Sequence, residues 1–173
     1  MEIRQKTLRP SDVVVALQVA LTPEHSLAYL AGAAKRSIGE VHNAEKRLRG
    51  AGLIDPERRI VEREPLLQFI RWGVPFAFPA STGGTTVGVA TALIIEGPGL
   101  DEPERCEFVW PWRNGQSRGE SLAPLHPRVP ELAEQNPHLR MLLALVDLIR
   151  IGGVRERTAA VAELERIIRQ PSH

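Results

Sequence analysis

The sequence predicts an α+β protein, with helical segments at both ends and a β-rich segment between them. Apolar residues recur at helical spacing in residues 1–72 and again in residues 131–173. Residues 73–130 instead hold 8 of the 14 prolines and 8 of the 14 glycines, together with two runs of strand-forming residues. We therefore expect a first unit over residues 1–73 and a second unit over residues 74–173.

Length and charge exclude several classes of protein. The 173 residues suffice for one domain with its own core, so no disulfide or metal is needed for folding. Lys and Arg number 22 against 21 Asp and Glu, which excludes a strongly basic nucleic-acid coat and an acidic tail. The N-terminus has no apolar stretch typical of a secretion signal, and no run of about 18 apolar residues predicts a membrane span. We expect a cytoplasmic protein that does not bind a membrane.

The first unit is predicted to contain three short helices. Pro10 suits the first turn of the first helix, and Ser26 is expected to cap the second. Ser37 and Glu40 have the spacing of a capping box at the start of the third helix, and Gly52 follows its end. The expected helices span residues 10–21, 27–34 and 38–51.

A hairpin and a fourth helix are predicted to follow. Two short apolar runs, 53–54 and 59–61, flank a turn with Pro56 at its favoured second position. A helix is then expected from Glu64-Pro65 to a stop at Gly73.

The second unit is predicted to combine strands and a helix pair. Residues 85–95 and 107–112 have strand composition, and Gly83-Gly84 is expected to form a turn before the first strand. Two helices, 137–151 and 154–169, are expected on either side of Gly152-Gly153.

The order helix, helix, turn, capped helix and hairpin is that of a winged helix-turn-helix. Residues 10–72 also resemble the DNA-binding domain of MarR-like and IclR-like regulators. The matching residues are Leu30-Ala31, Ser37, Val41, Arg47-Leu48 and Gly52-Leu53. Two positions depart from that pattern, because Lys35-Arg36 occupy a turn that usually holds Gly and a buried Leu, and Glu45 replaces a residue that is often apolar.

The resemblance implies a transcriptional regulator that binds double-stranded DNA, more often a repressor than an activator. The third helix would enter the major groove, where Asn43 can pair with adenine, while Lys46 contacts phosphate. Glu40 is expected to serve the cap rather than to read a base. The predicted DNA-contacting residues are Arg36, Ser37, Ile38, Gly39, His42, Asn43, Lys46, Arg47, Arg58 and Arg59. The alternative is a winged-helix protein-interaction module, of antitoxin-like or defence-operon type, with little or no DNA role.

The sequence shows no pattern of an enzyme, a metal site or a cofactor site. The five histidines lack the spacing of metal ligands, and Cys106 is the only cysteine. Trp110 and Trp112 are expected in the core or at a subunit contact, with a ligand- or partner-binding site as the alternative.

The helix over residues 137–151 is apolar around much of its circumference. This pattern indicates either a homodimer interface or a helix at the centre of a monomer. We expect a homodimer, because two recognition helices one DNA turn apart can read a palindrome. The second unit would then serve dimerisation, or the sensing of a small-molecule effector or a protein partner.

Overall fold

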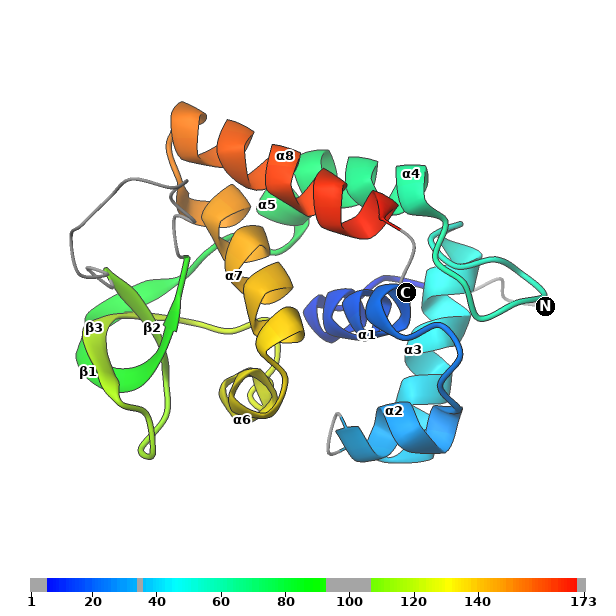
Figure 1. Cartoon of the computed structure of the whole chain (residues 1–173), viewed down its shortest axis with the longest axis horizontal. Coiled ribbons are helices and arrows are strands. Elements are labelled where there is room, and N and C mark those ends of the chain that lie inside the picture. The colour runs from blue at the N-terminus through cyan, green and yellow to red at the C-terminus, as the bar shows by residue number, and fades with distance from the viewer. Residues whose placement is uncertain (1–5, 34–35, 93–106, 171–173) are drawn as a thin grey trace.

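The computed structural model describes residues 6–33, 36–92 and 107–170, and it confirms the α+β class. Helix α7 (Pro137–Ile151) lies in the middle of the molecule, with a small three-stranded sheet on one side and α1 (Pro10–Leu21) on the other (Figure 1). Among the described residues, no helix combines the length and apolar character that crossing a bilayer requires.

The first three helices form where local signals predict them. Helix α2 spans Leu27–Ala33 and α3 spans Ile38–Gly50. At the start of α2, the Ser26 hydroxyl accepts a hydrogen bond of 3.1 Å from the backbone N–H of Tyr29. Helix α1 is buried along residues 11–19 because it packs against both α3 and α7.

The predicted hairpin exists in a minimal form. A single antiparallel bridge joins Ile54 to Val61, and the N–H of Glu62 donates to the carbonyl of Leu53 at 2.9 Å. The chain enters this hairpin through Gly52, whose φ of 74° lies in the left-handed region. A residue with a Cβ would be strained there, so glycine sets the end of α3.

The fourth helical segment does not stop at Gly73 as predicted. Helix α4 (Arg63–Gln68) continues through a π-helical turn, η1 (Phe69–Gly73), into α5 (Val74–Ala77). The Phe69 ring lies against Gly73, where a Cβ would come within 2.5 Å of the ring, so a glycine leaves room for it. The predicted boundary between two units at residue 73 therefore falls inside one continuous helical segment.

The sheet is built from β1 (Thr82–Thr91), β2 (Phe108–Pro111) and β3 (Ser117–Leu122). Strand β1 pairs antiparallel with both β2 and β3, and β2 pairs parallel with β3, so the three strands close on one another. Gly88 lies where β1 and β2 cross closely, and a Cβ there would collide with the Trp110 carbonyl.

The strand predictions need two corrections. Gly83-Gly84 lie within β1, not in a turn before it, because β1 pairs with β3 from Thr82 onward. Strand β3 has no counterpart in the prediction, since residues 117–122 contain no β-branched or aromatic residue. Residues 93–95 of the predicted first strand lie outside the described residues.

The C-terminal helices match the prediction, apart from the additional short helix α6 (Val129–Gln135). Asn136 caps α7 by accepting from the backbone N–H of Leu139 at 3.0 Å. Gly152-Gly153 separates α7 from α8 (Val154–Arg169), which lies across α7 and α4 (Figure 1).

A polar cluster is buried between α7 and the sheet. The Asp147 carboxylate accepts from Trp110 Nε1 at 2.6 Å and from Thr91 Oγ1 at 2.7 Å. Its second oxygen accepts from Arg150 at 2.7 Å, and Arg150 also donates to the carbonyl of Phe78. Burial raises the pKa of Asp147, whereas Arg150 and the two other donors oppose that shift. Trp110 thus belongs to the core, which was one of the positions predicted for it from the sequence.

Helix α7 is the centre of one hydrophobic core. Residues 142–150 are all buried within a single chain, so their apolar excess needs no dimer to cover it. The core cluster contains Leu17 of α1 and Leu142 of α7 alike, which joins the two predicted units in packing. The apolar circumference of α7, from which a homodimer was predicted, is therefore explained by packing within one chain.

Candidate nucleic-acid interface

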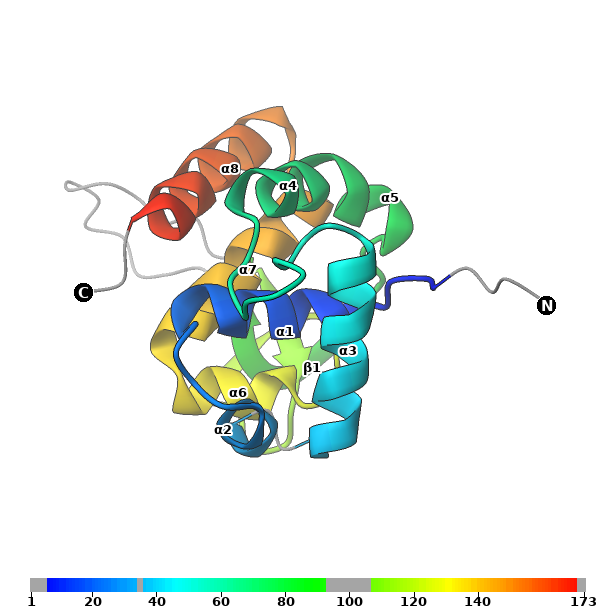
Figure 2. The same cartoon turned by 90° about the vertical axis from the view of Figure 1, so that its right-hand side faces the viewer.

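Helix α3 has an inner apolar side and an open polar side. Val41, Ala44 and Leu48 are buried, as their spacing predicts. On the opposite side Asn43 and Lys46 are exposed. Helix α3 lies at the edge of the molecule in Figure 1 and toward the viewer in Figure 2, where no other described helix or strand covers it.

The start of α3 is fixed by the predicted capping box. Ser37 Oγ accepts from the backbone N–H of Glu40 at 3.1 Å, and the Glu40 carboxylate accepts from the N–H of Ser37 at 2.8 Å. The hydrogen bonds that the Ser37 backbone N–H and the Ser37 hydroxyl donate to this carboxylate hold the pKa of Glu40 below its ordinary value. Glu40 is thus occupied by the cap, as expected. Ile38, whose side chain is 54% exposed, and Gly39 form the open first turn.

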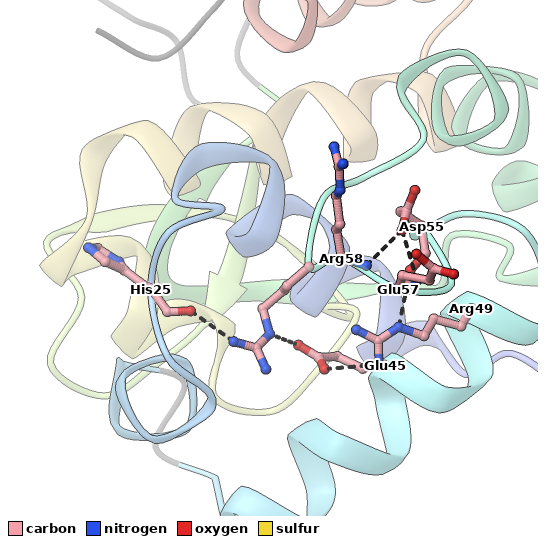
Figure 3. Close-up of polar contacts among 7 residues, drawn as sticks. His25, Glu45, Arg49, Asp55, Glu57 and Arg58 are labelled. Atoms are coloured by element: carbon pink, nitrogen blue, oxygen red, sulfur yellow. Dashed lines mark hydrogen bonds and ion pairs between the residues drawn. The ribbon is translucent and has the colours of Figure 1, made fainter.

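Glu45 is buried but not unpaired. Its side chain is 1% exposed and accepts a hydrogen bond from Arg59 of the hairpin, while Arg49 lies 3.8 Å away (Figure 3). Arg59 also donates to the carbonyl of His25 at 3.2 Å. This buried carboxylate is therefore compensated by two arginines, and these contacts tie the hairpin to α3 and to the loop before α2.

Arg47 is held by a carboxylate of α1. Its Nε and Nη2 donate to Asp12 at 2.7 and 2.6 Å, in a two-pronged ion pair with a carboxylate that is 1% exposed. Asp12 accepts a further hydrogen bond of 2.9 Å from the backbone N–H of Arg9. The hydrogen bond with Asp12 raises the pKa of Arg47. Arg47 and Arg59 were both predicted as DNA contacts, and the structure gives both of them partners within the chain.

A basic groove of about 460 Å³ lies beside α3. Four cations line it, no acidic residue within the described ranges does, and Asn43 contributes an amide. The lining residues are Lys6, Thr7, Leu8, Arg9, Asn43, Lys46 and Arg47. Lys6 and Arg9 are exposed, and the sequence prediction omits them. Arg9 directly precedes the proline that starts α1 and Lys6 lies four residues before it, but this spacing alone places neither of them beside α3.

The hairpin presents one exposed arginine. The backbone N–H groups of Glu57 and Arg58 donate to Asp55 Oδ1 at 2.8 and 2.7 Å, which shapes the turn and lowers the pKa of Asp55. The Arg58 side chain points away from the Glu45 cluster (Figure 3). Of the two arginines predicted at the hairpin, Arg58 is thus the one whose guanidinium is open to solvent.

The turn before α3 holds a half-buried cation. Arg36 donates a long hydrogen bond of 3.5 Å to Ser11 Oγ, and its Nε and Nη1 have no partner within the described part of the chain. Burial and the charge of Arg36 hold the pKa of His126 below its ordinary value. His42 is half-buried one turn into α3. Lys35 lies outside the described residues.

The structure thus gathers one part of the predicted set on an open surface. Asn43 and Lys46 come together with Lys6 and Arg9, and we call this set the α3 face. Within residues 6–33, 36–92 and 107–170, no three potential metal-ligating side chains form a cluster. Cys106 falls outside these ranges. Comparison of the chain with protein-family models, with curated proteins and with solved structures yields no match.

Proposed function

We propose that this protein is a sequence-specific DNA-binding transcriptional regulator of the winged-helix type. The observation that carries the proposal is the α3 face. Its Asn43 and Lys46 lie on the exposed side of a helix next to Lys6 and Arg9, in a groove to which no described acidic residue contributes. A helix of the 13 residues in α3 fits the major groove, which admits one helix together with its side chains.

The residues divide by their expected contacts. Asn43 offers the amide pair that matches adenine, and exposed Ile38 can contact a thymine methyl. Lys6, Arg9 and Lys46 would hold phosphates, which position the protein without specifying a sequence. Arg58 would contact the DNA phosphates or enter the minor groove beside the hairpin. Repression, rather than activation, rests on the family resemblance alone.

A protein-interaction module is the second candidate. Two of the predicted phosphate contacts, Arg47 and Arg59, are engaged by Asp12 and Glu45, which leaves fewer free cations for DNA. Exposed Ile38 at the tip of α3 suits a protein contact as well as a thymine. The two candidates differ in their response to salt, because only DNA binding releases many counterions.

Salt dependence gives the first test. Purified protein is incubated with random duplex fragments, the bound fraction is sequenced, and affinity for the selected sequence is measured between 50 and 200 mM salt. With Lys6, Arg9, Lys46 and Arg58 on phosphates, affinity should fall roughly 150-fold per subunit over that range. Failure to retain any duplex at 50 mM salt would favour the protein-interaction module.

Replacing Asn43 by alanine tests base readout. Asn43 is exposed and makes no hydrogen bond or ion pair with any described residue, so we expect the fold to be unchanged. We expect a loss of about 1–3 kcal/mol in binding to the selected sequence and a relaxed preference at one base pair. Equal affinity of Asn43→Ala and the wild type for that sequence would remove Asn43 from the readout. Lys46→Ala is the matched control, since it should weaken binding to all sequences alike.

A further inference from the structure

An exposed apolar groove lies on a different part of the molecule. It has a volume of about 400 Å³ and runs between the η1–α5 segment and α8. Trp72, Phe76 and Val154 line it and are 59%, 79% and 85% exposed. Large apolar side chains gathered on one surface usually mark a contact with another molecule. None of the lining residues belongs to the α3 face.

The charges along α8 identify what covers this groove. Arg157, Val161 and Glu165 follow one another at four-residue spacing, so they share one side of α8, and all three line the groove. Arg157 lies four residues before Val161 on α8 and Glu165 lies four residues after it, and the two carry opposite charges. If two copies of α8 cross antiparallel at Val161, each arginine meets the glutamate of the other copy. This stripe of α8 is therefore complementary to itself, whereas Arg71, the third charged residue of the groove, lies over the Trp72 ring at 4.5 Å.

The two charged groups at the ends of this stripe are available for such a contact. Glu165 has no ion pair or hydrogen bond with any residue that the structure describes, unlike Glu163, which binds Arg166 at 2.6 Å. Arg157 is exposed, and its one hydrogen bond within the described residues is the donation of Nε to the carbonyl of Gly152 at 2.7 Å.

We propose that this groove is the interface of a two-fold symmetric homodimer. Helix α8 pairs antiparallel with its copy, Arg157 meets Glu165 of the partner subunit in both directions, and Phe76 of each copy packs into the groove of the other. An interface of this kind uses the same patch on both subunits. The inference stands independently of DNA binding, although a dimer would supply the two copies of α3 that a palindrome requires.

The apolar contact is tested without DNA. Sedimentation velocity of the wild-type protein over a range of concentrations should show a dimer at micromolar concentration. Phe76→Ser should weaken self-association roughly 100-fold, because symmetry removes the anchor twice. Tyr29→Ser is the matched control, since Tyr29 is an exposed aromatic residue outside the groove. It should leave the dimer intact.

Charge reversal tests the antiparallel geometry. Arg157→Glu alone and Glu165→Arg alone should each weaken self-association about tenfold or more, because like charges then face each other twice. An equimolar mixture of these two variants should form a mixed dimer, and the double variant Arg157→Glu/Glu165→Arg should dimerise as the wild type does. Arg155→Glu, on an exposed part of α8 outside the groove, should have no effect.

Two results would overturn the dimer. One is a wild-type protein that remains monomeric at 100 micromolar. The other is a dimer that resists Phe76→Ser and both charge reversals. A monomer that still binds the selected DNA through α3 would refute this interface and leave the proposed function standing, whereas a groove-dependent dimer without DNA affinity would do the reverse.

Discussion

Replacing Asp147 by alanine should lower the free energy of unfolding by about 3–5 kcal/mol, because it leaves the buried Arg150 without its counter-charge. Arg150 is 4% exposed in its side chain and cannot reach solvent without disturbing α7. The indole N–H of Trp110 and the hydroxyl of Thr91 would lose their acceptor in the same step. The measurement is urea unfolding followed by circular dichroism, with the slope of the transition checked against the wild type.

Two further variants separate this effect from the general cost of losing an ion pair. Glu163→Ala removes a partly exposed pair with Arg166 and should cost about 1 kcal/mol or less. Asp147→Leu combined with Arg150→Met should regain part of the stability, because no unpaired charge is then left inside. A loss as small for Asp147→Ala as for Glu163→Ala would show that the buried cluster does not hold α7 to the sheet.

Replacing Arg47 by alanine should lower the free energy of unfolding by about 2–4 kcal/mol, somewhat less than for a fully buried pair. Its partner Asp12 is 1% exposed, and of its donors in the described part of the chain only the backbone N–H of Arg9 would remain. The neighbouring Lys46 is exposed, so Lys46→Ala should change stability by less than about 0.5 kcal/mol. Two adjacent cations on α3 are thus expected to differ in their roles.

Unfolding and DNA binding must be measured on the same two variants. Lys46→Ala should fold as the wild type does and bind every DNA sequence more weakly. Arg47→Ala should unfold at lower urea concentration, and Asp12→Asn should do likewise, since both break one ion pair. An Arg47→Ala protein of unchanged stability that binds DNA as weakly as Lys46→Ala would return Arg47 to the phosphate-contacting set.

The elements that the sequence predicts well are those with local signals. Helix α3 begins at Ser37 because the capping box lies within four residues, and α7 begins after Asn136 for a similar reason. The paired glycines at 152 and 153 end α7 without any help from distant residues. Strand β3 lacks such a signal, because only its pairing with β1 defines it. At Gly73 the local signal misleads, since a glycine that predicts a helix stop lies inside the continuous segment from α4 to α5.

The candidate site divides in the same way. The outward position of Asn43 follows from its place opposite Val41, Ala44 and Leu48 on a helix, so the sequence suffices to find it. The sequence cannot assign Arg47, because its partner Asp12 lies 35 residues away on another helix. Lys6 and Arg9 join the α3 face only because the chain before α1 passes beside α3.

The sequence by itself determined the α+β class, the positions of most helices and the outward side of α3, because periodicity, caps and glycine stops act within a few residues. The tertiary structure decided which charges are free. It placed Asp12 and Glu45 in the interior, where each carboxylate must be neutralised by an arginine, and it covered α7 while leaving Trp72 and Phe76 exposed. Burial and ion pairing depend on contacts between segments that are far apart in the sequence, and no local sequence pattern predicts such contacts.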